Sequence, residues 1–509
     1  MDYANRFDRA VAGVYEARER DWRQGAVIYQ VLVDRFAPSA DLEAKRHLYP
    51  APKRLRTWDE LPRAGRYLED QHLWSQEIEF WGGDLPSMRA RLGHVQQLGA
   101  DVLYLNPICS AYTNHKYDAL DYHAVSPEYG TRDDVKALAE DLHAHGMKLV
   151  LDGVFNHMGR NSPLYREAAA DPASPKRSWF FFGDEYPGGS RSWFRAQNLP
   201  ELNLENPAVR EHLFGGRDSV VRRWLRDGVD GWRLDVAFDI GFTVLEQLTR
   251  AAHEEKVGSL VVGEIANYPR EWFPSVDAVM HFALRGLMLR LADGRLDAPT
   301  FGRMFTRLVE ETGTENMLRS WIYLDNHDTA RLATLVPDVR ARRLLQVLQF
   351  TLPGAPNLYY GSELDMEGGA DPEMRAPMRW DLVTPDNQAL AWTKQLIAMR
   401  RSHRALRVGD YRPVSANRLL AFERHTDRAA DTVIVVANPS DQTLTETLMV
   451  GNSKMMDNTR LVDLLAPDSR EDLRLWAALL DITVPPKTVR VLSPVTAPLG
   501  GYTNYKRVQ

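Results

Sequence analysis

The hexapeptide Asp230-Gly231-Trp232-Arg233-Leu234-Asp235 closes a short apolar stretch, and the rest of the chain can be ordered around it. In an extended strand successive side chains point to opposite faces, so Arg233 and Asp235 share one face and Leu234 takes the other. A guanidinium beside a carboxylate favours the ionised carboxylate at neutral pH. The pair is therefore either a structural ion pair at a strand end or part of a reactive site, and the hexapeptide alone favours neither.

The composition is that of a globular protein, with 44% hydrophobic and 26% charged residues among 509. The net charge of -6 argues against nucleic acid or an anionic membrane as a partner. Cys109 is the only cysteine, which excludes an internal disulfide. Residues 1–25 are charged throughout and lack the apolar core of a signal peptide, and no run is long and apolar enough to span a bilayer. We therefore expect a cytoplasmic protein with no membrane partner.

Strand and helix patterns alternate along most of the chain. Apolar runs typical of buried strands occur at 27–33, 101–105, 147–151, near Gly231, and at 260–262, 278–280, 321–324 and 357–360. Helical periodicity occurs at 85–98, 209–226, 244–255 and 340–351. A further helix is predicted to begin after the N-cap residue Thr131 and to stop at Gly146. Eight strands alternating with helices predict an α/β fold, a parallel (β/α)8 TIM barrel.

Two stretches depart from this alternation. Residues 158–206 are too long for an ordinary connection after the third strand and are rich in aromatic residues, which predicts a small inserted subdomain. From about residue 409 the helical patterns cease, and apolar runs predict a C-terminal antiparallel β-domain. We assign 1–25 to an N-terminal helical extension, 26–157 and 207–408 to the barrel, 158–206 to the inserted subdomain and 409–509 to the C-terminal β-domain.

Polar residues follow the ends of four of the predicted strands. Barrel enzymes keep their chemistry at the C-terminal ends of the strands. The residues there are Asp152, Asn156 and His157 after the third strand, Arg233 and Asp235 after the fourth, Glu264 after the fifth, and His327 and Asp328 after the seventh. Each group alone could be the solvent-facing start of a loop. Four of them in register on separate strands indicate one site at the mouth of the barrel.

These motifs resemble the four hallmark segments of the α-amylase family of glycoside hydrolases, in the same order and at similar spacing. They read DGVFNH (152–157), GWRLDVA (231–237), GEIAN (263–267) and LDNHDTAR (324–331). LPELN (199–203) resembles the fifth segment of that family, which lies in the inserted domain, and GAPNLYYGSE (354–363) resembles its eighth-strand signature. The resemblance covers about residues 24–404 and implies a barrel followed by the usual β-domain of the family.

Within that family, three segments are most similar to the neopullulanase/cyclomaltodextrinase/maltogenic amylase group: NHKYD (114–118), LPELN (199–203) and DPEMRAPMRW (371–380). That group carries an N-terminal β-domain, whereas about 25 residues precede the first predicted strand here. The group also usually has Trp-His after the acid/base, where this chain has Ala266-Asn267. Plain α-amylases have Lys-His shortly after the nucleophile, where Phe238 and Asp239 stand here. These differences leave the bond and the acceptor open.

The resemblance also assigns roles to individual residues. It implies that Asp235 is the nucleophile, Glu264 the general acid/base and Asp328 the stabiliser of the transition state. Retaining hydrolysis needs two carboxyl groups about 5–5.5 Å apart, one that attacks the anomeric carbon and one that protonates the leaving oxygen. Substrate-binding roles are implied for Tyr117, which stacks on the sugar in the cleaved subsite, and for His157, Arg233, His327, Asp371 and Arg375. Asp152 and Asn156 are expected to support the site.

The main interpretation is retaining hydrolysis of α-1,4-glucosidic bonds in maltodextrins, cyclodextrins or related α-glucans, with or without transfer to another sugar. The first alternative is an α-glucan transferase, or a sucrose- or trehalose-acting transglycosidase, on the same scaffold. A non-catalytic sugar-binding relative would predict a lost carboxylate, and all three are present. We expect no cofactor and no required metal, because there is no clustered Asp/Asn ligand loop. An α-glucan or maltooligosaccharide substrate is the only partner implied, and the oligomeric state is left open.

Overall fold

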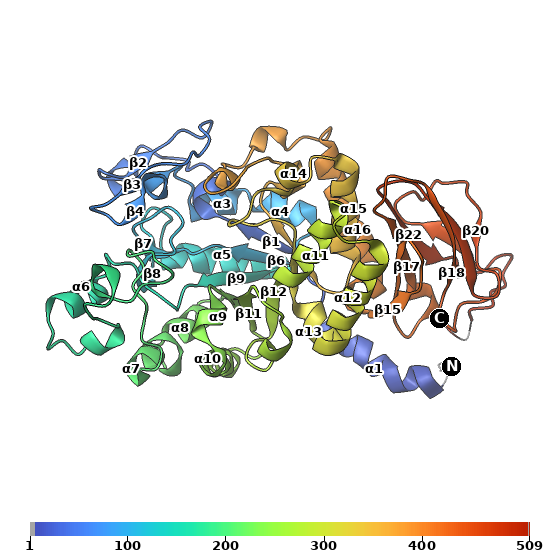
Figure 1. Ribbon diagram of the computed structural model, residues 1–509, viewed down its shortest axis with the longest axis horizontal. Coiled ribbons are helices and arrows are strands. Elements are labelled where there is room, and N and C mark those ends of the chain that lie inside the picture. Colours follow the sequence, from blue (N-terminus) through green and yellow to red (C-terminus); the bar gives the residue numbers. More distant parts are fainter. Residues whose placement is uncertain (1–5, 507, 509) are drawn as a thin grey trace.

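The computed structural model describes residues 6–506 and residue 508 (Figure 1). Eight parallel strands close into a barrel, which confirms the predicted fold. In chain order they are β1 (Ile28–Val31), β6 (Val102–Leu105), β9 (Lys148–Gly153), β10 (Gly231–Leu234), β11 (Leu260–Ile265), β12 (Ala278–His281), β13 (Trp321–Tyr323) and β14 (Ala355–Tyr359). The barrel is closed by β1, which pairs with both β6 and β14.

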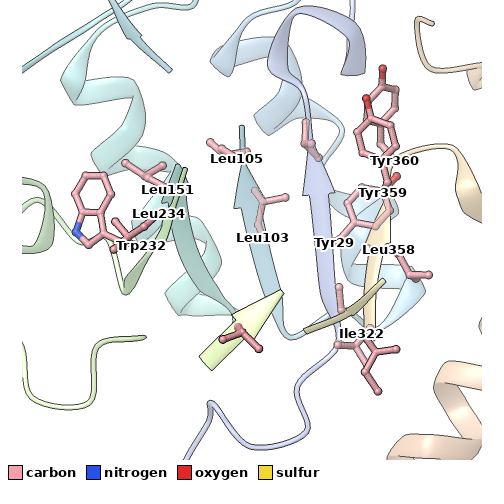
Figure 2. Close-up of a cluster of buried hydrophobic side chains, with 14 of the residues drawn as sticks. Tyr29, Leu103, Leu105, Leu151, Trp232, Leu234, Ile322, Leu358, Tyr359 and Tyr360 are labelled. Atoms are coloured by element: carbon pink, nitrogen blue, oxygen red, sulfur yellow. The ribbon is translucent and has the colours of Figure 1, made fainter. Parts of the chain in front are cut away.

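Strand alternation divides the barrel residues into two cores. One set forms a small inner cluster that includes Val102, Val150, Val262 and Met280. The other set packs with the surrounding helices in the main core; Figure 2 shows part of it, with side chains from β1, β6, β9, β10, β13 and β14. Both faces of each strand are thus apolar over most of their length, as expected of parallel strands covered by helices. The polar side chains of the predicted site lie toward or beyond the C-terminal ends of the strands.

The helices largely follow the predicted periodicity. Those around the barrel include α3 (Leu85–Ala90), α4 (Leu92–Leu98), α5 (Arg132–Ala144), α8 (Val220–Arg226), α10 (Phe242–Glu255), α11 (Phe282–Ala292), α12 (Ala298–Thr312), α13 (Thr314–Arg319), α15 (Val339–Thr351), α16 (Gln388–Ser402) and α17 (Arg404–Val408). Thr131 caps α5 as predicted, because its hydroxyl accepts from the Asp134 amide while the Asp134 carboxylate accepts from the Thr131 amide.

Two predicted helices are broken in the structure. The segment 85–98 divides at Arg91, which has φ -101° and ψ 5°, into α3 and α4. The segment 209–226 divides into α7 (Pro207–Arg210), a π-helical turn (Glu211–Gly215) and α8. Gly215 and Gly216 lie at this second break, where glycine weakens a continuous helix.

The stretch between β1 and α3, where no strand or helix was predicted except the helical segment that begins at residue 85, contains short strands. β2 (Arg54–Leu55) pairs with β5 (Glu79–Phe80), and β3 (Tyr67–Leu68) forms a hairpin with β4 (Leu73–Trp74). A separate small core of Tyr49, Leu73, Ile78 and Phe80 supports them. The sequence pattern did not reveal these strands, because the four apolar side chains that bury one another lie within a largely polar sequence.

Two further layers adjoin the barrel. After β9 the chain forms the inserted subdomain, which contains α6 (Pro163–Ala170) and returns through the isolated bridges His157↔Glu201 and Phe180↔Leu202. At the other end of the molecule (Figure 1) lies the C-terminal β-domain. Its larger sheet consists of β15 (Asp410–Val414), β16 (Leu420–His425), β17 (Val433–Asn438), β22 (Thr488–Pro494), β19 (Arg460–Asp463) and β20 (Leu473–Arg474), and a second pair consists of β18 (Leu444–Met449) and β21 (Leu479–Val484).

The helix α1 (Arg6–Arg20) lies against the junction between the barrel and the C-terminal domain. Tyr15 donates a hydrogen bond to Asp410 at 2.6 Å, and Arg18 pairs with both Glu315 and Asp410 at 2.7 and 2.8 Å. These contacts join the N-terminal helix to α13 and to the first strand of the C-terminal domain. Within residues 6–506 and 508, none of the helices combines the length and the apolar character that crossing a bilayer requires.

Candidate active site

The predicted catalytic carboxylates line one cavity of about 610 Å³ at the C-terminal ends of the strands. Asp235 follows β10, Glu264 lies within β11, and Asp328 follows β13. The cavity is also lined by five of the predicted substrate-binding or neighbouring side chains, namely Tyr117, His157, Asp371, Arg375 and His115. Side chains separated by more than two hundred residues therefore face one space, as the strand-end pattern predicted.

Arg233 is the centre of the charge network. Its Nη1 lies 2.8 Å from Asp152 and 3.0 Å from Asp235, and its Nη2 lies 2.8 Å from Glu264. The guanidinium is fully buried, which acts to lower its pKa, but the neighbouring carboxylates outweigh burial and raise that pKa well above its ordinary value. Arg233 therefore stays charged and holds three carboxyl groups together beneath the cavity.

The pKa of Asp235 is shifted by burial and by several charged neighbours. We predicted that Arg233 would hold this carboxyl ionised, but burial raises its pKa well above the ordinary range, and Glu264, Asp152 and Asp328 add to that effect. Arg233 opposes the shift but is shared among three carboxyl groups. A buried carboxyl group that shares its guanidinium with two other carboxyl groups favours the protonated form more than a carboxyl group in an isolated ion pair does.

The backbone after Asp235 is held in an uncommon conformation. Val236 has φ 40° and ψ 45°, in the left-handed region that β-branched residues rarely adopt. In this conformation its amide donates a hydrogen bond to a Glu264 carboxyl oxygen at 3.0 Å. The strained residue therefore fixes the position of Glu264 relative to Asp235, its immediate neighbour in the chain.

Asp152 and Asn156, the predicted supporting residues, lie at different depths. Asp152 accepts hydrogen bonds from Tyr104 at 2.7 Å and Tyr117 at 2.9 Å in addition to its contact with Arg233. It therefore anchors both the guanidinium and the aromatic wall of the cavity. Asn156 is buried, and its carbonyl accepts from the Leu202 amide at 2.9 Å, which ties the third strand end to the inserted subdomain.

Tyr117 and His327 form a stacked pair at one side of the cavity. Their ring centroids are 5.5 Å apart and nearly parallel, and the Tyr117 hydroxyl lies 2.5 Å from His327 Nε2. The Gln30 amide nitrogen lies 2.8 Å from His327 Nδ1. Because an amide N–H can only donate, Nδ1 accepts this hydrogen bond, and the ring N–H of His327 is on Nε2. That proton faces the Tyr117 oxygen and the Asp328 carboxylate.

Asp328 lies between His327 and Arg375 at the cavity wall. It lies 3.0 Å from His327 Nε2 and 3.2 Å from Arg375 Nη2. Burial acts to raise the pKa of Asp328, but His327 and Arg375 outweigh it, so that the pKa lies well below its usual range. Asp328 therefore remains a carboxylate and contributes negative charge beside the space in front of Asp235.

The predicted loop residues Asp371 and Arg375 reach the same wall. Arg375 pairs with Asp371 at 3.0 Å, and its Nε donates to the His327 carbonyl at 2.8 Å. The loop thus carries a buried arginine that orients Asp328 and an Asp371 side chain that is about half exposed to the cavity. Both placements agree with a role in binding hydroxyl groups, although Arg375 also has a fixed structural contact.

His157 is buried, with neither of its ring nitrogens hydrogen-bonded to another described residue. Burial lowers its pKa to about 3, so the imidazole is neutral at neutral pH. The ring packs against Trp193 at a centroid distance of 5.6 Å. A buried, unpaired donor and acceptor in a cavity wall is expensive unless a ligand satisfies it, and sugar hydroxyls can do so.

Several cavity residues were not predicted. Trp193 comes from the inserted subdomain, and its indole N–H donates to Asp239 at 3.2 Å, which joins that subdomain to α9 (Ala237–Ile240), just after Asp235 in the chain. The aromatic richness of 158–206 was the available signal. Glu77 and Trp74 lie in the stretch between β1 and α3, where no motif marked them, and they line the cavity as well.

The described residues contain no group of three or more His, Cys, Asp and Glu side chains arranged to hold a metal ion. The polar groups of the cavity are instead engaged with one another, as in the contacts of Arg233 and Arg375. What the cavity offers is therefore carboxyl, imidazole, guanidinium and aromatic groups, a set suited to proton transfer and to recognition of a hydroxylated ring.

Comparison with known proteins agrees with this set. Residues 30–410 match the family described as Alpha amylase, catalytic domain. The chain is 32% identical to neopullulanase 2 of Thermoactinomyces vulgaris over 426 residues, which is 79% of this chain and 68% of that protein. It is 33% identical to a cyclomaltodextrinase of Bacillus sp over 374 residues, 70% of this chain and 66% of that protein. The chain thus spans about two thirds of the length of these relatives.

A solved structure extends the likeness to the whole architecture. The ligand-free cyclic α-maltosyl-(1→6)-maltose hydrolase of Arthrobacter globiformis superposes with a TM-score of 0.77 at 28% identity, covering 93% of this chain and 100% of that one. The family match covers more than half of the chain and includes every strand end that carries a predicted catalytic residue. The chain belongs to the α-amylase family and is a glycoside hydrolase.

Proposed function

We propose that this enzyme hydrolyses α-1,4-glucosidic bonds in maltodextrins, cyclodextrins or related α-glucans, with retention of anomeric configuration. The observation that carries the proposal is the placement of Asp235 and Glu264 on the two terminal nitrogens of Arg233, with Asp328 in the same cavity. A shared guanidinium keeps the two carboxyl groups side by side, as a covalent mechanism requires.

In the first step, Asp235 attacks the anomeric carbon while Glu264 gives its proton to the departing oxygen. The bond from the anomeric carbon to that oxygen breaks as an ester to Asp235 forms. Asp328 and the rings of His157 and His327 are placed to bind hydroxyls of the same sugar, and the Asp328 carboxylate stabilises the positive charge that develops on that sugar. Tyr117 offers an aromatic face for that sugar.

In the second step, Glu264 takes a proton from water and the resulting hydroxide displaces Asp235 from the anomeric carbon. Two displacements at one carbon restore the original configuration, so an α-linked substrate releases an α-anomer. The proton that Glu264 lost in the first step is recovered in the second. Arg233, which contacts Asp235, opposes the effect of burial on the pKa of that carboxyl group and favours the ionised form that attacks the anomeric carbon.

The substrate class is proposed from the relatives together with the cavity. Named relatives include a neopullulanase and cyclomaltodextrinases, and the solved structures include a complex of a cyclic maltosyl-maltose hydrolase with its cyclic substrate. In the present chain, the cavity combines flat aromatic rings with paired charges, which suits the apolar faces and the hydroxyl rims of glucose units.

Transfer to a sugar acceptor is a second candidate, favoured by one feature of the leaving-group side. Phe238, Ala266 and Phe282 line the cavity near Glu264, and Phe238 is 55% exposed. An apolar surface beside the acid/base favours a stacked sugar over water as the group that attacks the intermediate. The same covalent intermediate serves both outcomes, so transfer would change the acceptor and leave the catalytic residues unchanged.

Product analysis tests the proposal directly. The purified enzyme is incubated separately with cyclodextrin, pullulan, starch, maltotriose and sucrose, and the products are separated by chromatography. We expect cleavage of the α-1,4-linked glucans, with products longer than the substrate wherever transfer competes with hydrolysis. Cleavage of sucrose alone would place the enzyme in the alternative class, and the absence of cleavage of all five would contradict the proposal.

A further inference from the structure

The hairpin β3–β4 stands at one end of the catalytic cavity. Tyr67, His72, Leu73 and Trp74 all line that cavity, although the sequence around them reads as a polar loop. Trp74 is 48% exposed, and its ring meets that of Tyr67 at 5.6 Å in an edge-to-face contact. An indole left this exposed at the edge of a sugar-binding cavity needs an explanation beyond packing.

The hairpin is anchored firmly enough to act as a wall. Leu73 is 2% exposed and packs with Tyr49, Ile78 and Phe80 in a small core of its own. At the base of the hairpin, the Ser75 amide donates to the Arg66 carbonyl at 2.9 Å and the Ser75 hydroxyl accepts from the Arg66 amide at 3.1 Å. The exposed rings therefore project from a fixed support.

A series of contacts connects the hairpin to the reacting centre. Tyr117, whose ring stacks on His327, lies 5.7 Å from His115 by ring centroids. His115 Nε2 lies 2.9 Å from the Glu77 carboxylate, and that carboxylate accepts a hydrogen bond from the Trp74 amide. His115 and Tyr117 lie in the connection between β7 (Cys109–Ala111) and β8 (Ala119–Val125), and Figure 1 shows β3 and β4 near β7. The hairpin is thus on the Tyr117 side of the cavity.

The Tyr117 side is the donor side, by which we mean the part that holds sugars on the non-reducing side of the cleaved bond. Glu264 protonates the departing oxygen, so the leaving group lies toward Glu264, where Phe238 and Ala266 line the cavity. In the proposed mechanism, Tyr117 and Asp328 bind the sugar that becomes bonded to Asp235. Contacts connect the hairpin and Glu77 to Tyr117 through His115, and Asp371 to Asp328 through Arg375, so we place these groups on the donor side.

We infer that the hairpin β3–β4 limits the donor side, so that a linear α-glucan binds there by a short non-reducing end and is cleaved near that end. The inference rests on the proposed function and specifies which bond of a chain is cut. Tyr67 and Trp74 block the path of a longer chain, while the Glu77 carboxylate at the base of the wall offers an acceptor to hydroxyls of the terminal sugar. Burial acts to raise the pKa of Glu77, but hydrogen bonds from His115 and Trp74 outweigh it, and the lowered pKa keeps an acceptor there.

The test uses maltoheptaose tagged at its reducing end with 2-aminobenzamide, analysed by chromatography at low conversion. The wild-type enzyme should give one untagged short sugar and one predominant tagged product. The same substrate blocked at its non-reducing end by a 4,6-O-ethylidene group should react about tenfold more slowly or worse, because the block meets the wall. In Trp74→Ala, and more strongly in Tyr67→Ala/Trp74→Ala, tagged products of several lengths should appear and the blocked substrate should recover most of its rate.

Leu73 is kept in both variants, so the core of the hairpin is preserved, and unchanged thermal unfolding verifies it. Trp476→Ala is the matched control, since Trp476 is 60% exposed but lies in the C-terminal domain; it should keep the wild-type product pattern. Tagged products of many lengths from the wild-type enzyme, or equal rates on blocked and unblocked chains, overturn the inference while leaving the proposed function intact. No cleavage of maltoheptaose under any condition contradicts both.

Discussion

At the scale of single residues, the proposed mechanism depends most on the carboxyl group of Asp235. Asp235 lies 3.0 Å from Arg233 and lines the cavity. The amide of the next residue, Val236, donates a hydrogen bond to Glu264, which ties Glu264 to Asp235. The change Asp235→Asn keeps the shape and removes the nucleophile. We expect kcat to fall by several orders of magnitude while the unfolding temperature changes little.

The matched control for Asp235→Asn is Asp239→Asn, a substitution of the same kind four residues along the chain at the cavity edge. Asp239 accepts a hydrogen bond from the Trp193 indole. Among the described residues it has no hydrogen bond to Asp235, Glu264 or Asp328, so this variant should retain most of its kcat. A folded Asp235→Asn enzyme with near wild-type kcat would show that Asp235 is not the nucleophile.

Glu264 is tested through the leaving group. In Glu264→Gln no proton can be donated, so cleavage of maltooligosaccharides, whose leaving group is a poor one, should be strongly slowed. Hydrolysis of α-glucosyl fluoride should be affected much less, because fluoride departs with little protonation. The ratio of the two kcat/KM losses is the measurement, and equal losses on both substrates would be evidence against Glu264 as the acid.

The residues of this site were predictable to the extent that strand geometry determines them. Alternation along β10 places Arg233 beside Asp235, and the strand ends bring Glu264 and Asp328 to the same mouth. The direction of the Asp235 pKa shift was not predictable, because it depends on burial and on how many carboxyls share Arg233. Trp193 could not be placed either, since its contact with Asp239 joins two loops that are distant in sequence.

At the scale of elements, the loop after β14 makes a specific prediction about substrate binding. Asp371 faces the cavity and pairs with Arg375, which in turn contacts Asp328. Asp371→Ala should raise KM on short maltodextrins while kcat changes little. Each lost hydrogen bond to a charged group is worth roughly 1.5–3 kcal/mol, which corresponds to about a tenfold or larger rise.

Arg375→Ala should raise KM and also lower kcat, because Asp328 loses a cationic partner. Arg379→Ala is the control in the same loop, since Arg379 is exposed and pairs with Asp381 outside the cavity. Steady-state kinetics on a maltooligosaccharide series provide the measurement. If KM were unchanged in both Asp371→Ala and Arg375→Ala, the loop would not contribute to substrate binding.

The elements themselves were predicted unequally from the sequence. The eight barrel strands are apolar runs bounded by polar residues, and burial on both faces makes such runs recognisable. The break at Arg91 leaves helical periodicity on both sides, so the pattern over 85–98 does not reveal it. The hairpin β3–β4 was missed because its strands have two residues each and are stabilised by tertiary contacts of Leu73, which no local pattern displays.

At the scale of the whole molecule, the C-terminal domain shares a core with the barrel. Phe422, Val435 and Val491 belong to the same buried cluster as the barrel helices, and Arg424 donates to the Thr351 carbonyl at 2.7 Å. In a chain ending at residue 409, the apolar surfaces of α12 and α15 that the C-terminal domain covers would be exposed. We expect that fragment to be insoluble or to aggregate, whereas the full chain should unfold in one transition.

Expression of residues 1–409 beside the full chain, followed by size-exclusion chromatography and calorimetry, checks this expectation. Aggregation of the fragment agrees with a shared core. A soluble fragment with wild-type kcat and unfolding temperature would show that the C-terminal domain is independent of the barrel, despite the buried contact between them.

The central claim is that cleavage proceeds through a covalent bond to Asp235, and the configuration of the first product tests it most directly. Proton NMR of a maltooligosaccharide digestion, begun with a large amount of enzyme, records the anomeric signals before mutarotation mixes them. Two displacements at the anomeric carbon predict that the α-anomer appears first and the β-anomer only later, as mutarotation proceeds. A β-anomer released first would mean a single displacement by water, and would contradict the role of Asp235 as nucleophile.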